Sequence, residues 1–169
     1  VAAAHNQLFK VGPNLLDVWA GVLRRVQSIS LGSEKVRAVL WLLEHPADGL
    51  ENIRLEIASR GLDSPSVVVA SPFEKSRVAH VERLALIADC FLDTMRYSGG
   101  ATTADAVAAG LKVIILDSKA GLDDSRLFSS PVERLSHSLV HQHSNGKIWT
   151  ANLKDYEDSV VQVAKAALI

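Results

Sequence analysis

Five consecutive apolar residues, Val39-Leu40-Trp41-Leu42-Leu43, form a run that has no polar face. A run this short is typical of a strand that is buried on both faces, as in a parallel sheet. Similar runs recur at 67–70, 90–92 and 113–116, and a first strand precedes His5. The intervening segments have apolar residues at spacings of three and four, which predict amphipathic helices. We therefore expect a doubly wound, Rossmann-like α/β fold, with a parallel sheet of about six strands and helices on both faces.

The first predicted helix follows Pro13 and extends to Val26, because proline is favoured in the first turn of a helix. Glycine commonly follows the last turn, so Gly61 and Gly110 are expected to end two of the later helices. These later helices are predicted at 50–60, 77–87, 102–109 and 156–168. The polar segment 28–36 is interpreted as an inserted loop, and the pattern assigns no element to the Ser- and His-rich segment 135–146.

The composition is that of a globular protein, with 48% apolar and 22% charged residues in a chain of 169. This length predicts a single domain over 1–169. The apolar runs are far shorter than the roughly 20 residues that span a bilayer, and no signal peptide precedes them. A net charge of −1 argues against a nucleic-acid partner. We therefore expect neither a membrane nor a nucleic acid as partner.

Cys90 is the single cysteine, so no internal disulfide can form. It begins the apolar run at 90–92, where burial favours a packed thiol over a reactive one. Both points indicate a protein of a reducing compartment, the cytoplasm or the nucleus. The chain does not begin with Met, so we also expect a fragment of a larger protein.

Candidate ligand-binding residues follow the predicted strands, because open α/β sheets bind ligands at the carboxyl ends of their strands. The segment Gly99-Gly100-Ala101-Thr102-Thr103 combines glycines and hydroxyls at the start of a helix. Free amides and the positive end of the helix dipole suit a phosphate there. Alternatively, Thr102 or Thr103 only caps the helix. No dinucleotide-binding or Walker motif is present.

Three further groups of polar residues are candidate ligands or catalysts. Lys10 is a cation near the end of the first strand, or else an ordinary surface lysine. His80 and Arg83 share one helix face, which could equally be an exposed face without function. His137, His141 and His143 could hold zinc, but no fourth ligand is nearby, so we expect no metal.

The motifs resemble those of the O-linked N-acetylglucosamine transferases, in one order over nearly the whole chain. Asn6-Gln7-Leu8-Phe9-Lys10 resembles the Asn-Gln-Leu-Tyr-Lys motif of that family. The further segments that carry the resemblance are 16–26, 40–43, 52–54, Ser71-Pro72 with Lys75, His80-Val81-Glu82-Arg83, 88–94, 102–110, 125–126 and 155–158.

The resemblance implies the UDP-binding, carboxyl-terminal half of a GT-B glycosyltransferase. Such an enzyme moves N-acetylglucosamine from UDP-GlcNAc to Ser or Thr of acceptor proteins, without a metal or cofactor. Its parent chain carries an amino-terminal catalytic half and TPR repeats. The missing half implies an exposed apolar face on this domain.

Site roles are likewise implied by the resemblance alone. Lys10 matches the lysine that contacts the diphosphate and supports catalysis. The implied donor-binding residues are Gln7, Lys10, Ser71, Pro72, Lys75, His80, Arg83, Gly100, Ala101, Thr102, Thr103 and Asp105. By this resemblance, the segment from Ser71 to Lys75 lies against the uracil, and His80 and Arg83 lie beside the nucleotide. Thr102 and Thr103 contact the phosphates, and Asp105 contacts the ribose.

Several positions depart from the family pattern. The histidine that usually precedes the two threonines is replaced by Ala101. The segment 97–103 also resembles the SPINDLY protein O-fucosyltransferases, which use GDP-fucose. Two alternatives therefore stay open: a fucosyltransferase of the same fold, and a degenerate module that binds partner domains without catalysis.

Overall fold

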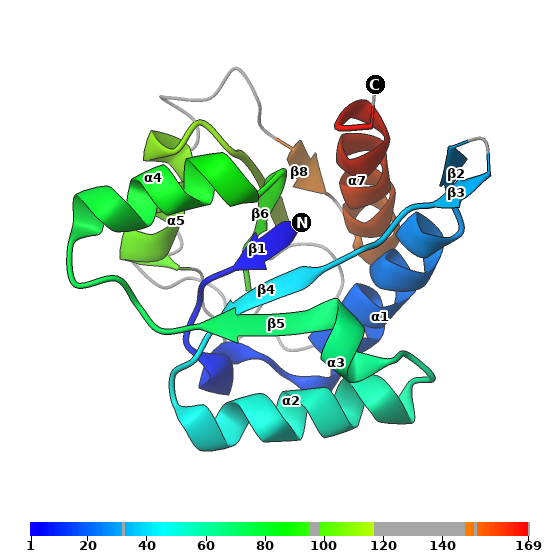
Figure 1. Cartoon of the computed structure of the whole chain (residues 1–169), viewed down its shortest axis with the longest axis horizontal. Coiled ribbons are helices and arrows are strands. Elements are labelled where there is room, and N and C mark those ends of the chain that lie inside the picture. The colour runs from blue at the N-terminus through cyan, green and yellow to red at the C-terminus, as the bar shows by residue number, and fades with distance from the viewer. Residues whose placement is uncertain (32, 95–98, 117–147, 151, 169) are drawn as a thin grey trace.

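The computed structural model describes residues 1–31, 33–94, 99–116, 148–150 and 152–168 (Figure 1). Its central feature is a six-stranded sheet with the order β5-β4-β1-β6-β7-β8, in which every neighbouring pair is parallel. The strands are β1 (Ala2–Ala4), β4 (Leu40–Leu43), β5 (Val68–Ser71), β6 (Cys90–Leu92), β7 (Lys112–Leu116) and β8 (Ile148–Thr150). This arrangement confirms the predicted Rossmann-like α/β fold.

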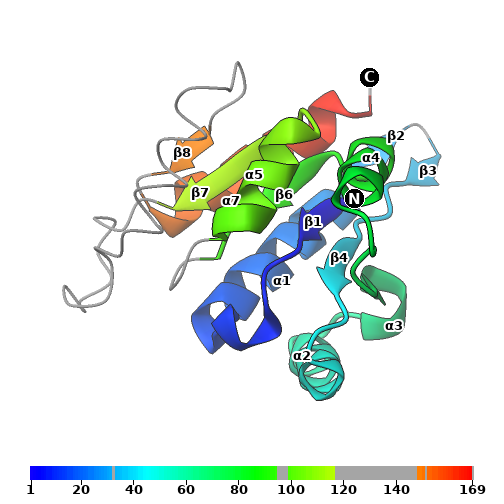
Figure 2. The same cartoon turned by 90° about the vertical axis from the view of Figure 1, so that its left-hand side faces the viewer.

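Helices cover both faces of the sheet. They are α1 (Pro13–Gln27), α2 (Ala47–Ser59), α3 (Ser64–Val67), α4 (Arg77–Ile87), α5 (Gly100–Ala108) and α7 (Leu153–Ala166). The larger core contains residues of α1, α2 and α7, whereas the smaller one contains residues of α4 and α5. Figures 1 and 2 show α2 and α4 on opposite sides of β4.

Alternation along β1 assigns its side chains to the two cores. Ala3 packs in the core of α4 and α5, and Ala4 packs in that of α1 and α7. Successive strand side chains point to opposite faces, so His5 continues on the side of Ala3. Directly after β1, the short helix η1 (Leu8–Lys10) brings Lys10 to the end of the strand.

The predicted helix at 77–87 is confirmed as α4, while other boundaries differ. Helix α7 begins at Leu153 rather than at 156, because the Asn152 side chain accepts a 2.9 Å hydrogen bond from the Asp155 amide and caps it. Helix α2 begins three residues before its predicted start. The segment 28–36, interpreted as a loop, contains an antiparallel pair, β2 (Ser30–Leu31) and β3 (Glu34–Lys35).

Some sequence interpretations cannot be compared with the structure. The segment 135–146 and its three histidines lie outside the described residues. Among the residues that are described, no helix has the combination of length and apolar character needed to cross a membrane.

Candidate functional site

A cavity of about 300 Å³ lies at the carboxyl edge of the sheet. Its walls come from the residues that follow β1, from the ends of β4 and β5 and from the start of α5. The lining residues are His5, Asn6, Gln7, Lys10, Leu43, His45, Phe73, Gly99, Gly100, Ala101 and Thr102. This is the edge at which open α/β sheets bind their ligands.

The start of α5 forms one wall of this cavity. The amide of Thr103 donates to the carbonyl of Gly99 at 3.0 Å, so the amides of 100–102 precede the hydrogen-bond ladder of the helix. Gly99 is the N-cap residue and both threonines lie inside the helix, so the alternative that Thr102 or Thr103 caps it is wrong. Unpaired amides and the helix dipole favour an anion at this position.

A network around Asp93 fixes this helix start against β1. The Oδ1 atom of Asp93 accepts hydrogen bonds from the side-chain amide of Asn6 at 3.2 Å and from the backbone amides of Thr94 and Gly99 at 2.8 and 2.9 Å. The hydroxyl of Thr102 donates to Asn6 Oδ1 at 3.0 Å. The two strand ends and the helix start therefore form one hydrogen-bonded unit.

Lys10 supplies a positive charge to the same cavity. Its side chain is half-buried, and burial holds the pKa of Lys10 below its ordinary value, although the nearby Asp93 carboxylate acts in the opposite direction. Gln7, the N-cap residue of η1, lines the cavity as an exposed polar residue. An ammonium group and the amides of a helix start in one cavity suit a diphosphate.

The wall beneath α4 is uncharged. His5 is fully buried, with its ring 4.3 Å from Trp41 in an edge-to-face arrangement and 5.2 Å from His80. Burial, together with His80 and Arg83, lowers the pKa of His5 to about 3, so the ring is neutral at pH 7. Phe73 is half-exposed and stacks on His80 at 4.6 Å.

Five predicted site residues line the cavity: Gln7, Lys10, Gly100, Ala101 and Thr102. Three others lie behind its wall. Ser71 is buried and accepts a 2.9 Å hydrogen bond from Trp41 Nε1. His80 is buried beneath Phe73. Arg83 lies 5.3 Å over the Trp41 ring and forms an ion pair with Glu74.

The remaining predicted residues do not line this cavity either. Asp105 is buried and forms an ion pair with Arg77 at 2.5 Å, and Thr103 is fully buried on another face of α5 than Thr102. Pro72 and Lys75 are exposed between β5 and α4. Burial separates Thr103 and Asp105 from the cavity, which a linear motif does not reveal.

The predicted set of site residues lacks six lining residues, namely His5, Asn6, Leu43, His45, Phe73 and Gly99. Of these, Phe73 and Gly99 lie within segments that were expected at the site. The strand alternation offered a signal for His5, since it shares the face of Ala3 and Trp41. No group of three or more His, Cys, Asp or Glu side chains that could hold a metal occurs among the described residues.

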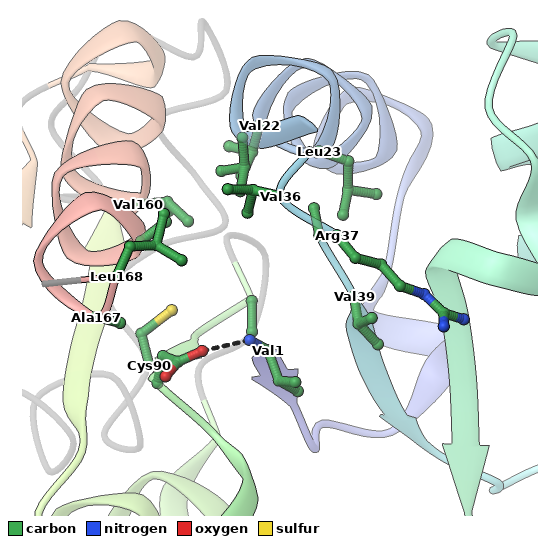
Figure 3. A pocket seen from close by; sticks show the side chains of 15 residues that line it. Val1, Val22, Leu23, Val36, Arg37, Val39, Cys90, Val160, Ala167 and Leu168 are labelled. Carbon is green, nitrogen blue, oxygen red and sulfur yellow. Dashed lines mark hydrogen bonds and ion pairs between the residues drawn. The ribbon is translucent and has the colours of Figure 1, made fainter. Parts of the chain in front are cut away.

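A second, smaller cavity lies at the opposite edge of the sheet (Figure 3). It has a volume of about 110 Å³ and is lined mainly by apolar side chains of α1, α7 and the strand starts. Cys90 contributes its thiol to this cavity, and an ion pair of the Val1 amino group with Asp89 lies at its margin. Burial raises the pKa of Cys90 to about 12, which confirms the predicted packed thiol.

Comparisons with known proteins show the family and the fold of this chain. The chain is 28% identical over 165 residues, 97% of its length, to the "Probable UDP-N-acetylglucosamine–peptide N-acetylglucosaminyltransferase SEC" of Arabidopsis thaliana. It is 33% identical over 111 residues, 66% of its length, to the UDP-N-acetylglucosamine–peptide N-acetylglucosaminyltransferase of Caenorhabditis elegans. The chain spans 15% and 9% of these relatives, respectively.

A solved structure shares the fold. This is a lysine-to-methionine variant of the O-GlcNAc transferase of Thermobaculum terrenum, with a TM-score of 0.69 and 20% identity. The match covers 97% of this chain and 28% of that structure. The family model of Glycosyl transferase family 41 matches residues 1–163. The chain therefore belongs to glycosyltransferase family 41.

Proposed function

We propose that the 300 Å³ cavity binds the nucleoside diphosphate of a sugar donor, UDP-GlcNAc. The observation that carries this proposal is that Lys10 and the start of α5 line one cavity. A diphosphate between them would receive a charge-assisted hydrogen bond and backbone amides at once. The names of the relatives from Arabidopsis and Caenorhabditis support UDP-N-acetylglucosamine as the donor.

The proposed reaction is transfer of N-acetylglucosamine to a Ser or Thr hydroxyl of an acceptor protein. The acceptor oxygen forms the new bond to the anomeric carbon of the sugar, and its proton passes to the departing diphosphate or to water as the bond from the sugar to the diphosphate breaks. Negative charge then develops on the departing UDP. Lys10 and the amides at the start of α5 would stabilise that charge, a preorganised electrostatic role that needs no metal or cofactor.

The whole enzyme is proposed to contain more than this domain. An amino-terminal catalytic half would supply the acceptor groove, and TPR repeats would recruit acceptor proteins in the cytoplasm or nucleus. Most exposed large hydrophobic side chains among the described residues belong to β5, α4 and their connection: Val69, Phe73, Val78, Leu86 and Ile87. We propose that the rest of the enzyme covers part of this apolar surface.

Calorimetric titration with UDP and GDP tests the proposal. We expect preferential binding of UDP, and Lys10→Met should weaken it by about 1.5–3 kcal/mol, the range for hydrogen bonds to charged groups. Lys112→Met is the matched control, since Lys112 is exposed at the start of β7, on the opposite edge of the sheet. Equal losses in both variants would indicate a general charge effect and contradict the role of Lys10.

The same titration decides between the alternatives. Preference for GDP would support a fucosyltransferase that uses GDP-fucose. Absence of binding of either nucleotide to the folded protein would support a non-catalytic interaction module.

A further inference from the structure

His5 has no hydrogen-bond partner for either of its ring nitrogens within the part of the chain that the structure describes. Its side chain is 0% exposed, yet it lines the cavity that contains Lys10 and Thr102. A buried polar atom without a hydrogen-bond partner lowers the stability of the folded protein. Each such atom therefore needs an explanation. A partner that arrives with a ligand is one such explanation.

The neighbours of His5 hold its ring in a fixed orientation. Its unpaired nitrogens are therefore not a result of loose packing. Trp41 contacts the ring edge-to-face, and His80 lies against another side. Phe73 stacks on His80 and continues the same wall. This aromatic cluster fixes the orientation of the imidazole without pairing its nitrogens.

The charge distribution in the cavity indicates what His5 can bind. Lys10 and the start of α5 suit an anion, whereas the wall of His5, Leu43 and Phe73 carries no charge. A neutral imidazole offers one donor and one acceptor. Such a group matches an uncharged polar part of a ligand, and not its phosphates.

Building on the proposed function, we propose that His5 recognises the uncharged part of the nucleotide-sugar donor through a ring-nitrogen hydrogen bond. That part is either the edge of the nucleobase or a hydroxyl of the transferred sugar. His5 is thereby a specificity-determining residue that acts separately from Lys10.

The test compares the parent protein with His5→Phe, which keeps a ring and removes both nitrogens. Calorimetry with UDP, UDP-GlcNAc and inorganic pyrophosphate separates the ligand parts. We expect a loss on the order of three- to tenfold in affinity for UDP-GlcNAc, as for one neutral hydrogen bond, and unchanged affinity for pyrophosphate. An equal loss for UDP identifies the nucleobase, and unchanged UDP affinity identifies the sugar.

Thermal unfolding supplies a second readout and a control. His5→Phe removes unpaired buried atoms, so we expect no loss of melting temperature. Thr150→Val is the control, because the buried Thr150 hydroxyl donates to the Ile115 carbonyl at 3.0 Å and does not line the cavity. This variant should lower the melting temperature and leave all three affinities unchanged. If His5→Phe does not fold, His5→Leu replaces it.

Three outcomes overturn the inference. Unchanged affinity of the His5 variant for both UDP and UDP-GlcNAc, in a parent that binds them, removes His5 from recognition and leaves the proposed function standing. An equal loss for all three ligands indicates a collapsed cavity instead of a lost contact. Failure of the folded parent to bind either nucleotide overturns the proposed function, and this inference with it.

Discussion

The hydroxyl of Thr102 donates a 3.0 Å hydrogen bond to the side-chain oxygen of Asn6, 96 positions earlier in the chain. The amide group of the same Asn6 donates to Asp93. Asn6 thus connects the end of β1 to the start of α5 on one side and to the residue after β6 on the other. This side chain, together with the hydrogen bond from the Gly99 amide to Asp93, fixes the position of the proposed phosphate site relative to the sheet.

Gly99→Ala tests this connection. A Cβ at position 99 would lie 2.0 Å from Asn6 Oδ1 and 2.3 Å from Thr102 Oγ1, so both side chains would have to move. We expect about 1–3 kcal/mol lower free energy of unfolding, the range for overpacking, and weaker UDP binding. Urea unfolding and calorimetry measure the two effects.

Gly49→Ala is the control for Gly99→Ala. Position 49 lies in α2, where an added Cβ meets the Leu8 side chain at 3.2 Å. The conformational gain of alanine over glycine in a helix offsets that contact, so we expect a much smaller change in unfolding free energy. Equal effects of the two substitutions would show that the Asn6 connection is not the sensitive element.

Lys10 should make UDP binding dependent on pH. Burial lowers the pKa of Lys10, so it loses its charge at a lower pH than an exposed lysine. We expect UDP affinity to fall as the pH rises through this pKa. Asp93 raises the pKa of Lys10, so Asp93→Asn should move the fall in affinity to lower pH. Titrations between about pH 7 and 10 measure this, and Lys10→Met should show no such fall.

His5 should lower the stability of the protein in acid. Its pKa is 6.5 when unfolded and about 3 when folded, so between these values the unfolded chain binds the extra proton. The contribution of neutral His5 to the free energy of unfolding is fully present above pH 6.5. It is lost as the pH falls toward the folded pKa, at up to about 1.4 kcal/mol per pH unit. His80 also has a lowered pKa and adds to the effect. Urea unfolding at pH 7 and pH 5 should show a smaller difference for His5→Phe than for the parent.

Two leucines on α4 offer a matched pair for stability. Leu84 is fully buried against the sheet, whereas Leu86 is 86% exposed. Leu84→Ala should lower the free energy of unfolding by about 2–5 kcal/mol, because it removes buried methyl groups and leaves a cavity. Leu86→Ala should change it by less than about 0.5 kcal/mol. Comparable losses in chemical denaturation would mean that Leu86 is covered in the protein.

Cys90 should resist thiol reagents while the protein is folded. Its thiol is 3% exposed and its pKa is raised to about 12 by burial, so the reactive thiolate is scarce at pH 8. We expect reaction with a disulfide reagent only after addition of denaturant. Rapid modification of the native protein would show that the small apolar cavity opens.

Elements with strong periodicity and clear ends were predicted well. Helix α4 follows a capping Ser76 and has the predicted bounds. The start of helix α7 was predicted three residues too late, because Lys154 and Asp155 interrupt the apolar pattern between Leu153 and Tyr156 and the cap at Asn152 was not recognised. The β2–β3 pair was missed because its two-residue strands are too short to show alternation.

The anion-binding half of the candidate site was easier to predict than the uncharged half. Lys10 and Thr102 belong to short motifs that place charge or hydroxyls at strand and helix ends. Thr103 was included with Thr102, although successive helical residues point in directions about 100° apart. His5 was not predicted, and Phe73 was expected only as part of the segment 71–75, because their positions depend on contacts with α4 that form only in the fold.

Contact between the first and last helices has a consequence for the order of events during synthesis. Trp19 of α1 donates to the Tyr156 hydroxyl of α7 at 3.4 Å, and that hydroxyl donates to the Asp93 carbonyl at 3.5 Å. A nascent chain on the ribosome therefore exposes the apolar face of α1 until α7 has emerged. Helix α7 supports Asp93, which precedes Tyr156 by 63 positions, so the hydrogen-bonded unit around the ligand site is complete only after α7 has been synthesised.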